Sequence, residues 1–96
     1  MRRRARLDTH QRAVVEALRA CGCSVYSLAE CGDGVPDLLV GTRGQTWLIE
    51  VKSDKNTHRR ATELTPAQES WHARWRGAKV VIVHTPAEAL AALGLA

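Results

Sequence analysis

Two carboxylates and one amine stand at spacings that could bring them together in space. Asp37 follows Pro36, and Glu50 and Lys52 flank Val51. Hard cations such as Mg²⁺ prefer carboxylate and carbonyl oxygens, so Asp37, Glu50 and the backbone carbonyl of Val51 are candidate metal ligands. Lys52 could orient an attacking water or stabilise a phosphate in the transition state. The set therefore predicts hydrolysis of a phosphodiester bond with the help of Mg²⁺ or Mn²⁺.

A β-hairpin is the element that must hold these groups. We expect strands over residues 37–40 and 47–51, with the turn centred on Arg43-Gly44. That turn puts Asp37 directly opposite Glu50, and strand alternation puts the lysine on the same face. A shift of one residue would separate them. The alternative is a surface ion pair, which stabilises little, but the apolar residues on both faces of these strands favour a covered site.

Apolar periodicity and helix-start signals predict the remaining elements. We expect an α/β fold in the order αβββαβα, with a mixed β-sheet of about four strands and helices on both faces. The hairpin is antiparallel, and the last strand joins through a helical crossover and is buried on both faces. Beside the hairpin, the expected elements are a helix over 7–20, a strand over 25–28, a helix from Thr65 to Gly77, a strand over 79–84 and a helix from Thr85 through Leu93.

Length and charge limit the possible organisation of the chain. Its 96 residues suit one domain, predicted over 7–96 after a basic tail over 1–6. The net charge is +4, and basic residues cluster in the tail and after the hairpin. Such clusters suit a phosphate backbone, although solvated segments are the simpler alternative. The candidate DNA-binding residues are Arg2, Arg3, Arg4, Lys55, Arg59 and Arg60. No secretion signal or membrane-spanning run is evident, so we expect a cytoplasmic protein that does not bind membranes.

Other side chains of potential chemical interest favour structural roles. Cys21, Cys23 and Cys31 lack the spacing of a zinc site, and we expect buried or half-buried free thiols. Trp71 and Trp75, at helical spacing, are expected in the core. The two later histidines, at positions 72 and 84, are expected to pack or lie at the surface rather than to act as a general base.

Three segments together resemble a known nuclease family. The Pro-Asp motif within 34–40, the Glu-Val-Lys motif within 48–52 and the Thr-Pro-Ala-Gln helix start within 64–71 resemble the PD-(D/E)XK nuclease superfamily. They are most similar to the VRR-NUC group, in the minimal stand-alone form found in phages and prophages. The resemblance covers nearly the whole chain. It implies a restriction-endonuclease-like core in which Asp37 and Glu50 bind Mg²⁺ or Mn²⁺ and Lys52 is catalytic.

The resemblance also bears on two further positions. It implies that Gln68 lies beside the site, although Gln68 also completes a capping box with Thr65 that needs no function. Many relatives carry an acidic residue on the first helix that points at the metals. Here the inward stripe of that helix carries Gln11, whereas Glu16 faces outward. We therefore prefer Gln11 as the residue of the first helix that contributes to metal binding.

The implied activity is that of a structure-selective DNA endonuclease. Stand-alone relatives are similar to junction resolvases, so the resemblance implies branched DNA as substrate, a Holliday-junction resolvase-like activity and a homodimer. One alternative is a catalytically silent nucleic-acid-binding module that has kept the nuclease fold. A small protein-interaction domain is a second alternative. The sequence carries no signal for reading specific bases.

Overall fold

The predicted order of elements and the mixed sheet are confirmed. The computed structural model describes residues 9–52 and 64–96. The predicted basic tail, the candidate DNA-binding residues Arg2, Arg3, Arg4, Lys55, Arg59 and Arg60, and the first two residues of the expected first helix lie outside this part. The elements are α1 (Thr9–Ala20), β1 (Ser24–Ser27), a 3₁₀ helix η1 (Ala29–Cys31), β2 (Leu38–Thr42), β3 (Gln45–Val51), α2 (Pro66–Arg74), β4 (Val81–Val83) and α3 (Pro86–Ala92).

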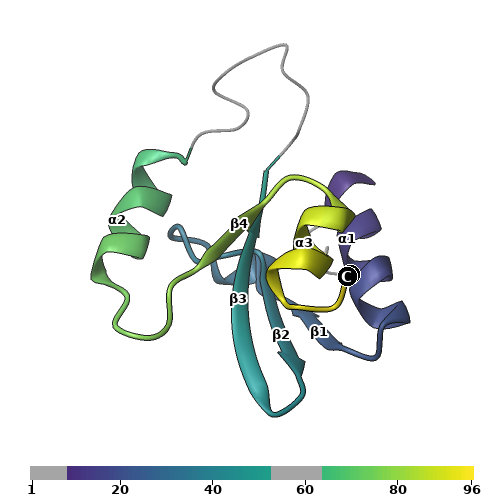
Figure 1. Cartoon of the computed structure of the whole chain (residues 1–96). Helices are drawn as coiled ribbons and strands as arrows, with labels where there is room; N and C mark the ends of the chain where they lie inside the picture. The colour runs from purple at the N-terminus through teal and green to yellow at the C-terminus, as the bar shows by residue number, and fades with distance from the viewer. Residues whose placement is uncertain (1–8, 53–63) are drawn as a thin grey trace.

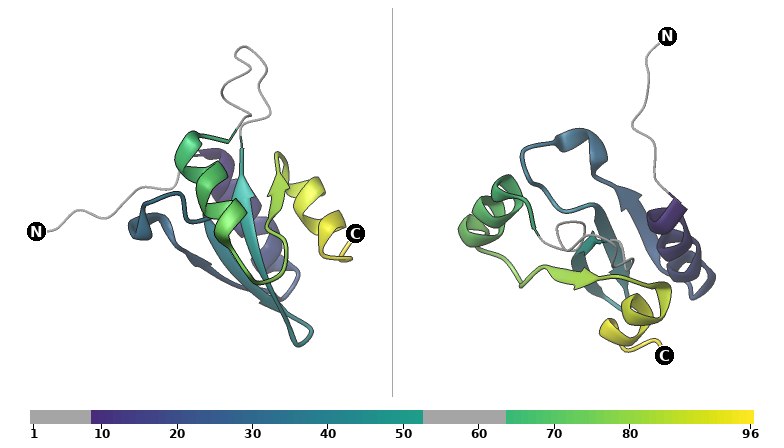
Figure 2. Two further views of the ribbon diagram at one scale, coloured as in Figure 1. Left: turned by 90° about the vertical axis from the view of Figure 1, so that its left-hand side faces the viewer. Right: turned by 90° about the horizontal axis from the view of Figure 1, so that it is seen from above.

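The four strands form one sheet in the order β1-β2-β3-β4. The pairs β1–β2 and β2–β3 are antiparallel, and β4 runs parallel to β3. Figure 1 shows α1 and α3 on one side of this sheet and α2 on the other. The view from above in Figure 2 shows the same separation of the helices by the sheet. The expected helical crossover therefore brings α2 across the face opposite α1 and α3.

The central hairpin has the predicted register. Leu38 pairs with Ile49, so the preceding residue, Asp37, falls opposite Glu50. Arg43 and Gly44 form the turn with φ angles of 51° and 77°, the left-handed pair that two-residue hairpin turns require. The strands extend further than expected, to Thr42 and from Gln45, because a two-residue turn allows pairing up to its edge.

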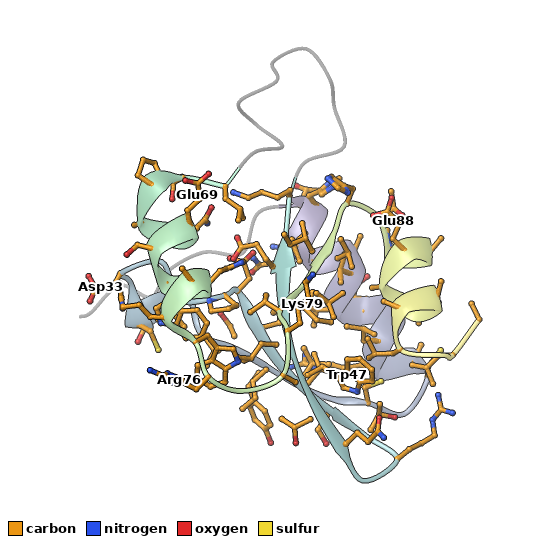
Figure 3. The ribbon with its side chains drawn as sticks, turned by 60° about the vertical axis from the view of Figure 1, so that its left-hand side comes forward. Asp33, Trp47, Glu69, Arg76, Lys79 and Glu88 are labelled. Carbon is orange, nitrogen blue, oxygen red and sulfur yellow. The ribbon has the colours of Figure 1, made fainter. Side chains whose placement is uncertain are left out.

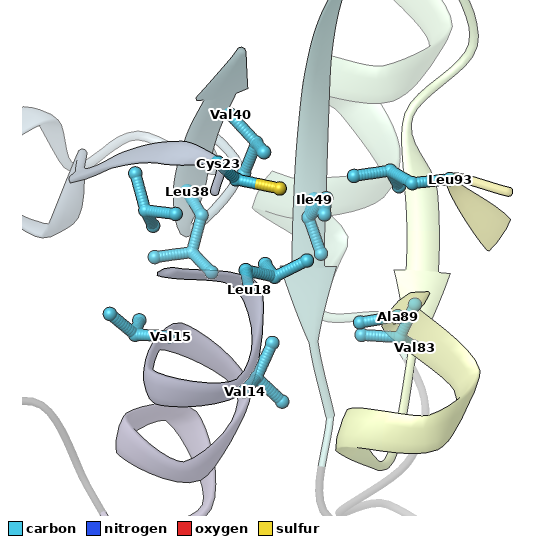
Figure 4. Close-up of a cluster of buried hydrophobic side chains, with 11 residues drawn as sticks. Val14, Val15, Leu18, Cys23, Leu38, Val40, Ile49, Val83, Ala89 and Leu93 are labelled. Carbon is cyan, nitrogen blue, oxygen red and sulfur yellow. The ribbon is translucent and has the colours of Figure 1, made fainter. Parts of the chain in front are cut away.

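One hydrophobic core lies between the sheet and the pair α1 and α3. Alternate residues of the strands point toward it, as the period of two requires. Figure 4 shows side chains from both helices meeting those of β2, β3 and β4. The buried cluster comprises Val14, Val15, Leu18, Cys23, Val25, Leu38, Val40, Ile49, Val83, Ala89 and Leu93. This core fixes the hairpin and leaves the opposite face of the sheet to α2.

The face under α2 is more open than the sequence suggested. The prediction that β4 is buried on both faces was wrong, because Ile82 is 41% exposed. The prediction of a core position for Trp71 and Trp75 was also wrong. The two indoles stack on each other, and Trp75 is 41% exposed. The physical reason is that α2 is only nine residues long, and none of its residues is fully buried.

Smaller differences concern the segment around β1. The strand begins one residue earlier than expected and leads into η1, which the sequence analysis missed. The expectation of buried or half-buried thiols holds only for Cys23, since Cys21 and Cys31 are exposed. Cys31 ends the short η1, and Cys21 lies in the turn that follows α1. Among the described residues, no helix is long and apolar enough to cross a membrane.

Candidate active site

The hairpin brings Asp37 and Glu50 together at one end of the sheet. Glu50 lies in β3 and is only 1% exposed. Asp37 stands immediately before β2, and its Oδ2 accepts a hydrogen bond of 2.7 Å from the backbone N–H of Val51. The N–H and C=O of a strand residue point toward the same neighbouring strand. The carbonyl of Val51 therefore also faces the Asp37 side, and its role as a metal ligand stays a prediction.

The electrostatics of this pair are unfavourable without a cation. The pKa of Glu50 is raised from 4.5 to about 8, first by burial and then by the Asp37 carboxyl, while Lys52 opposes the rise. In addition, Oε1 of Glu50 is buried and has no hydrogen-bond partner among the described residues. A buried acceptor of this kind costs free energy until it finds a partner. A divalent cation would satisfy both the orphaned oxygen and the paired charges, so the residues fit a metal ion.

The donor set suits a hard cation that keeps water ligands. Among the described residues, no group of three or more His, Cys, Asp and Glu side chains could hold a metal ion. Two carboxylates and one carbonyl are nevertheless a sufficient protein contribution for Mg²⁺, which usually retains several waters. This donor set contains no thiolate or imidazole of the kind that zinc prefers. Asp37, Glu50 and Val51 therefore form a candidate Mg²⁺ or Mn²⁺ site.

Lys52 and Gln68 meet at the same carboxylate from different elements. The amine of Lys52 donates to Oε1 of Gln68 over 2.8 Å and lies 3.9 Å from Oε2 of Glu50. The amide nitrogen of Gln68 donates to that same Oε2 over 2.9 Å. Gln68 thus fixes the lysine and the carboxylate relative to each other, and it brings the first turn of α2 to the hairpin.

The capping box of α2 is part of the same arrangement. Thr65 is the N-cap, and its hydroxyl accepts from the backbone N–H of Gln68 over 3.2 Å. The side chain of Gln68 accepts in return from the N–H of Thr65 over 2.9 Å. Its Oε1 therefore serves both the helix cap and Lys52. The two interpretations that the sequence left open, cap and site residue, are both consistent with these contacts.

A close backbone contact places the start of α2. Gly34 has a φ angle of 84°, and a Cβ at this position would lie 2.2 Å from the carbonyl oxygen of Ala67. Only glycine fits, because both the left-handed backbone and the space exclude a side chain. Gly34 lies three residues before Asp37. One short segment therefore positions the carboxylate on one side and the helix that carries Gln68 on the other.

His72 is a neighbour of the candidate active site, although the sequence predicted only a packing or surface role for it. Burial lowers its pKa, and the charge of Lys52 lowers it further, so the imidazole is neutral near pH 7. Its Nε2 is buried without a hydrogen-bond partner among the described residues. The available signal was its spacing, because four residues after Gln68 is one helical turn along the same face. His84 lies elsewhere, where its carbonyl accepts from Nε2 of His10.

The first helix presents its two candidates as the periodicity predicted. Gln11 is buried on the inward face of α1, and Glu16 is exposed. A contribution of Gln11 to metal binding stays a prediction. The described residues thus bring Asp37, Glu50, Lys52 and Gln68 into one cluster. Glu50 comes from β3 and Gln68 from α2, whereas Asp37 directly precedes β2 and Lys52 directly follows β3.

Comparison with known proteins identifies the family of the chain. No protein-family model matches it, and no curated protein matches it. A solved structure described as "VRR_NUC domain" is 35% identical to the chain, with a TM-score of 0.64. The alignment covers 88% of this chain and 89% of that one.

The αβββαβα fold and the match to this solved structure place the chain in the PD-(D/E)XK nuclease superfamily. Within that class, the chain belongs to the VRR_NUC domain family. It is therefore a member of a nuclease family, and that family implies a nucleic-acid partner.

Proposed function

We propose that the protein is a structure-selective DNA endonuclease that uses Mg²⁺ or Mn²⁺. The observation that carries this proposal is the buried Glu50 beside the half-buried Asp37, held within reach of Lys52 by Gln68. A buried carboxyl whose pKa is raised by burial and by a neighbouring carboxyl is costly in a protein that only binds nucleic acid. The same arrangement is useful in an enzyme that needs a cation and a lysine at one phosphate.

Each residue of the cluster has a distinct role in this proposal. Asp37, Glu50 and the carbonyl of Val51 would hold the cation, which supplies positive charge to offset the charge that develops on the phosphate. The Lys52 amine donates hydrogen bonds to a phosphate oxygen or to the attacking water. Gln68 positions that amine, because its Oε1 accepts a hydrogen bond from it.

Branched DNA and a symmetric dimer form the finer part of the proposal. A chain of 96 residues offers little surface for recognising a four-way junction by itself. Two copies related by a two-fold axis would place two identical sites on two symmetry-related strands of such a junction. Holliday-junction resolution is therefore the specific activity we propose. A strictly monomeric protein at working concentration would instead favour nicking or flap cleavage.

A cleavage panel tests the proposal. Labelled four-way junction, flap and linear duplex DNA are each incubated with Mg²⁺ or Mn²⁺, and products are resolved on denaturing gels. We expect cleavage of the branched substrates, and its loss in Asp37→Asn, Glu50→Gln and Lys52→Met. Glu16→Gln, which neutralises an exposed carboxylate on α1, is the matched control and should cut normally. Binding without cleavage of any substrate would instead identify a silent nucleic-acid-binding module.

A further inference from the structure

A short segment after α2 concentrates positive charge and an exposed indole. Residues 74–79, Arg-Trp-Arg-Gly-Ala-Lys, are all exposed, and we call them the basic-aromatic segment. Three of the seven Lys and Arg residues in the described part of the chain lie here. No Asp or Glu occurs between Glu69 and Glu88. The segment is therefore a local positive surface on a described body that carries equal numbers of acidic and basic residues.

Most other cations of the described part are already engaged. Arg19 donates to the carbonyl of Val25, and Arg43 donates to the carbonyl of Leu93. By contrast, Arg76 and Lys79 make no ion pair or side-chain hydrogen bond with any described residue. Figure 3 shows Arg76 at the end of α2 that is remote from Glu69. These two charges are therefore available to an anionic partner.

Trp75 is held rigidly although much of its surface is open. Its ring stacks on Trp71 with centroids 4.8 Å apart and an interplanar angle of 18°. Its Nε1 donates to the carbonyl of Ala78 over 2.9 Å. A Cβ on Gly77 would lie 2.6 Å from the ring, so the turn wraps closely against the indole. Trp75 is 41% exposed. A side chain that is already ordered loses little conformational entropy when it binds a ligand.

Exposed aromatic rings between cations are the elements that bind unpaired nucleotides. Bases stack on aromatic side chains regardless of sequence, while Arg and Lys neutralise the adjacent phosphates. In a continuous duplex, by contrast, the faces of the bases are covered by neighbouring base pairs. Charge alone would suit any DNA, and the indole adds a preference for DNA that offers an open base. If the partner were a protein instead, Arg76 and Lys79 would be expected to contact acidic side chains rather than the phosphates of a DNA backbone.

We propose that the basic-aromatic segment is a DNA-binding subsite that recognises an unpaired base beside the cleavage site. Trp75 stacks on that base, and Arg76 and Lys79 bind the flanking phosphates. Trp75 lies seven residues after Gln68, which corresponds to about 10 Å along a helix. The subsite and the candidate active site are thus close enough to contact one strand. This inference rests on the proposed function and narrows it to branched DNA that carries an unpaired base at the branch point, next to the cut.

Binding measured without divalent metal tests the subsite independently of cleavage. Fluorescence anisotropy in EDTA compares a fully paired duplex with the same duplex carrying an unpaired strand. We expect Trp75→Leu to lower the affinity for the partly unpaired DNA about tenfold, within the range for loss of one stacked base, and to change duplex binding less than about twofold. Tyr26→Leu is the matched control, because Tyr26 is 64% exposed on β1, at the opposite edge of the sheet, and should have no effect.

Charge variants keep the test decisive if Trp75→Leu should fail to fold. Arg76→Gln and Lys79→Gln alter side chains without described partners. Each is expected to weaken binding to both DNAs and to reduce the slope of log affinity against log salt by about 1. Arg12→Gln, an exposed cation on α1, is the control and should leave the slope unchanged.

Several outcomes would overturn the subsite. These are unchanged affinity in Trp75→Leu, equal losses for paired and unpaired DNA, an unchanged salt slope in both charge variants, or a change of oligomeric state with normal DNA binding. The last result would assign the surface to a second copy of the chain. Failure of the proposed function looks different. In that case the wild-type protein would discriminate unpaired DNA through Trp75 yet cut none of the substrates with either metal.

Discussion

Replacing Glu50 by glutamine should stabilise the metal-free protein at alkaline pH while abolishing its activity. The wild-type carboxyl has a pKa raised from 4.5 to about 8 by burial and by Asp37. The folded state therefore holds a proton that the unfolded state releases. This contribution to stability is fully present below about pH 4.5 and is lost as the pH rises through about 8. Above that pH, folding must bury a charged Glu50 beside another carboxylate.

The size of the effect follows from the two pKa values. At about 1.4 kcal/mol per pKa unit, the difference between 4.5 and about 8 corresponds to several kcal/mol, with about 5 kcal/mol as the upper limit. Glutamine keeps the shape and the acceptor for Gln68 but does not ionise. Glu50→Gln should therefore match the wild type near pH 4.5 and exceed its free energy of unfolding by several kcal/mol at pH 9.

Urea denaturation in EDTA between pH 4.5 and 9 measures this difference. Glu69→Gln is the control, because it removes an exposed carboxylate from α2 and should leave the pH profile unchanged. Added Mg²⁺ or Mn²⁺ should raise the stability of the wild type and not that of Glu50→Gln. A wild-type stability that does not fall between pH 4.5 and 9, or a glutamine variant less stable than wild type at pH 9, would refute the electrostatic account of the site.

Three further substitutions probe the surroundings of the site. Gly34→Ala should lower the free energy of unfolding by at least about 1 kcal/mol and slow DNA cleavage, because it combines backbone strain with displacement of α2. Gly32→Ala is the control. Gly32 also has a positive φ angle but has open space around it, so this variant should show backbone strain alone and cut normally. Gln68→Ala and Thr65→Ala should each cost about 0.5–2 kcal/mol of stability through the lost cap. Only Gln68→Ala should also reduce the cleavage rate. Equal cleavage rates in the two variants would contradict a positioning role for Gln68. His72→Phe should raise the free energy of unfolding by about 1 kcal/mol by removing a buried nitrogen without a described partner, and a decrease seen in thermal unfolding would show that the imidazole is bonded.

Local signals allowed the hairpin and the helix start to be predicted from the sequence. The Arg43-Gly44 turn fixes the register by its backbone geometry, and that register places Asp37 opposite Glu50. The Thr65 cap likewise depends on neighbouring residues only. Both features are determined by interactions among residues close in the sequence, so they do not depend on tertiary packing.

The remaining features depend on contacts between distant segments. Trp71 and Trp75 share a helix face, but helical spacing does not show what that face meets. The role of Gly34 depends on the approach of Ala67, 33 residues later. His72 gains its proximity to the site only when α2 docks on the sheet. Each of these positions is decided by how much of the outer face α2 covers, which no local pattern specifies.

The double role of Gln68 has a consequence for how this domain can vary. Gln68 accepts hydrogen bonds from both Lys52 and Thr65, which are 13 residues apart in the sequence. These two contacts hold the ends of the intervening segment close together. The entropy of closing such a segment increases by only about 0.6 kcal/mol for each doubling of its length. Insertions between Lys52 and Thr65 should therefore be tolerated without rebuilding the carboxylate pair. The fold thereby offers a position beside the candidate active site where length and composition can diversify while the carboxylate pair is preserved.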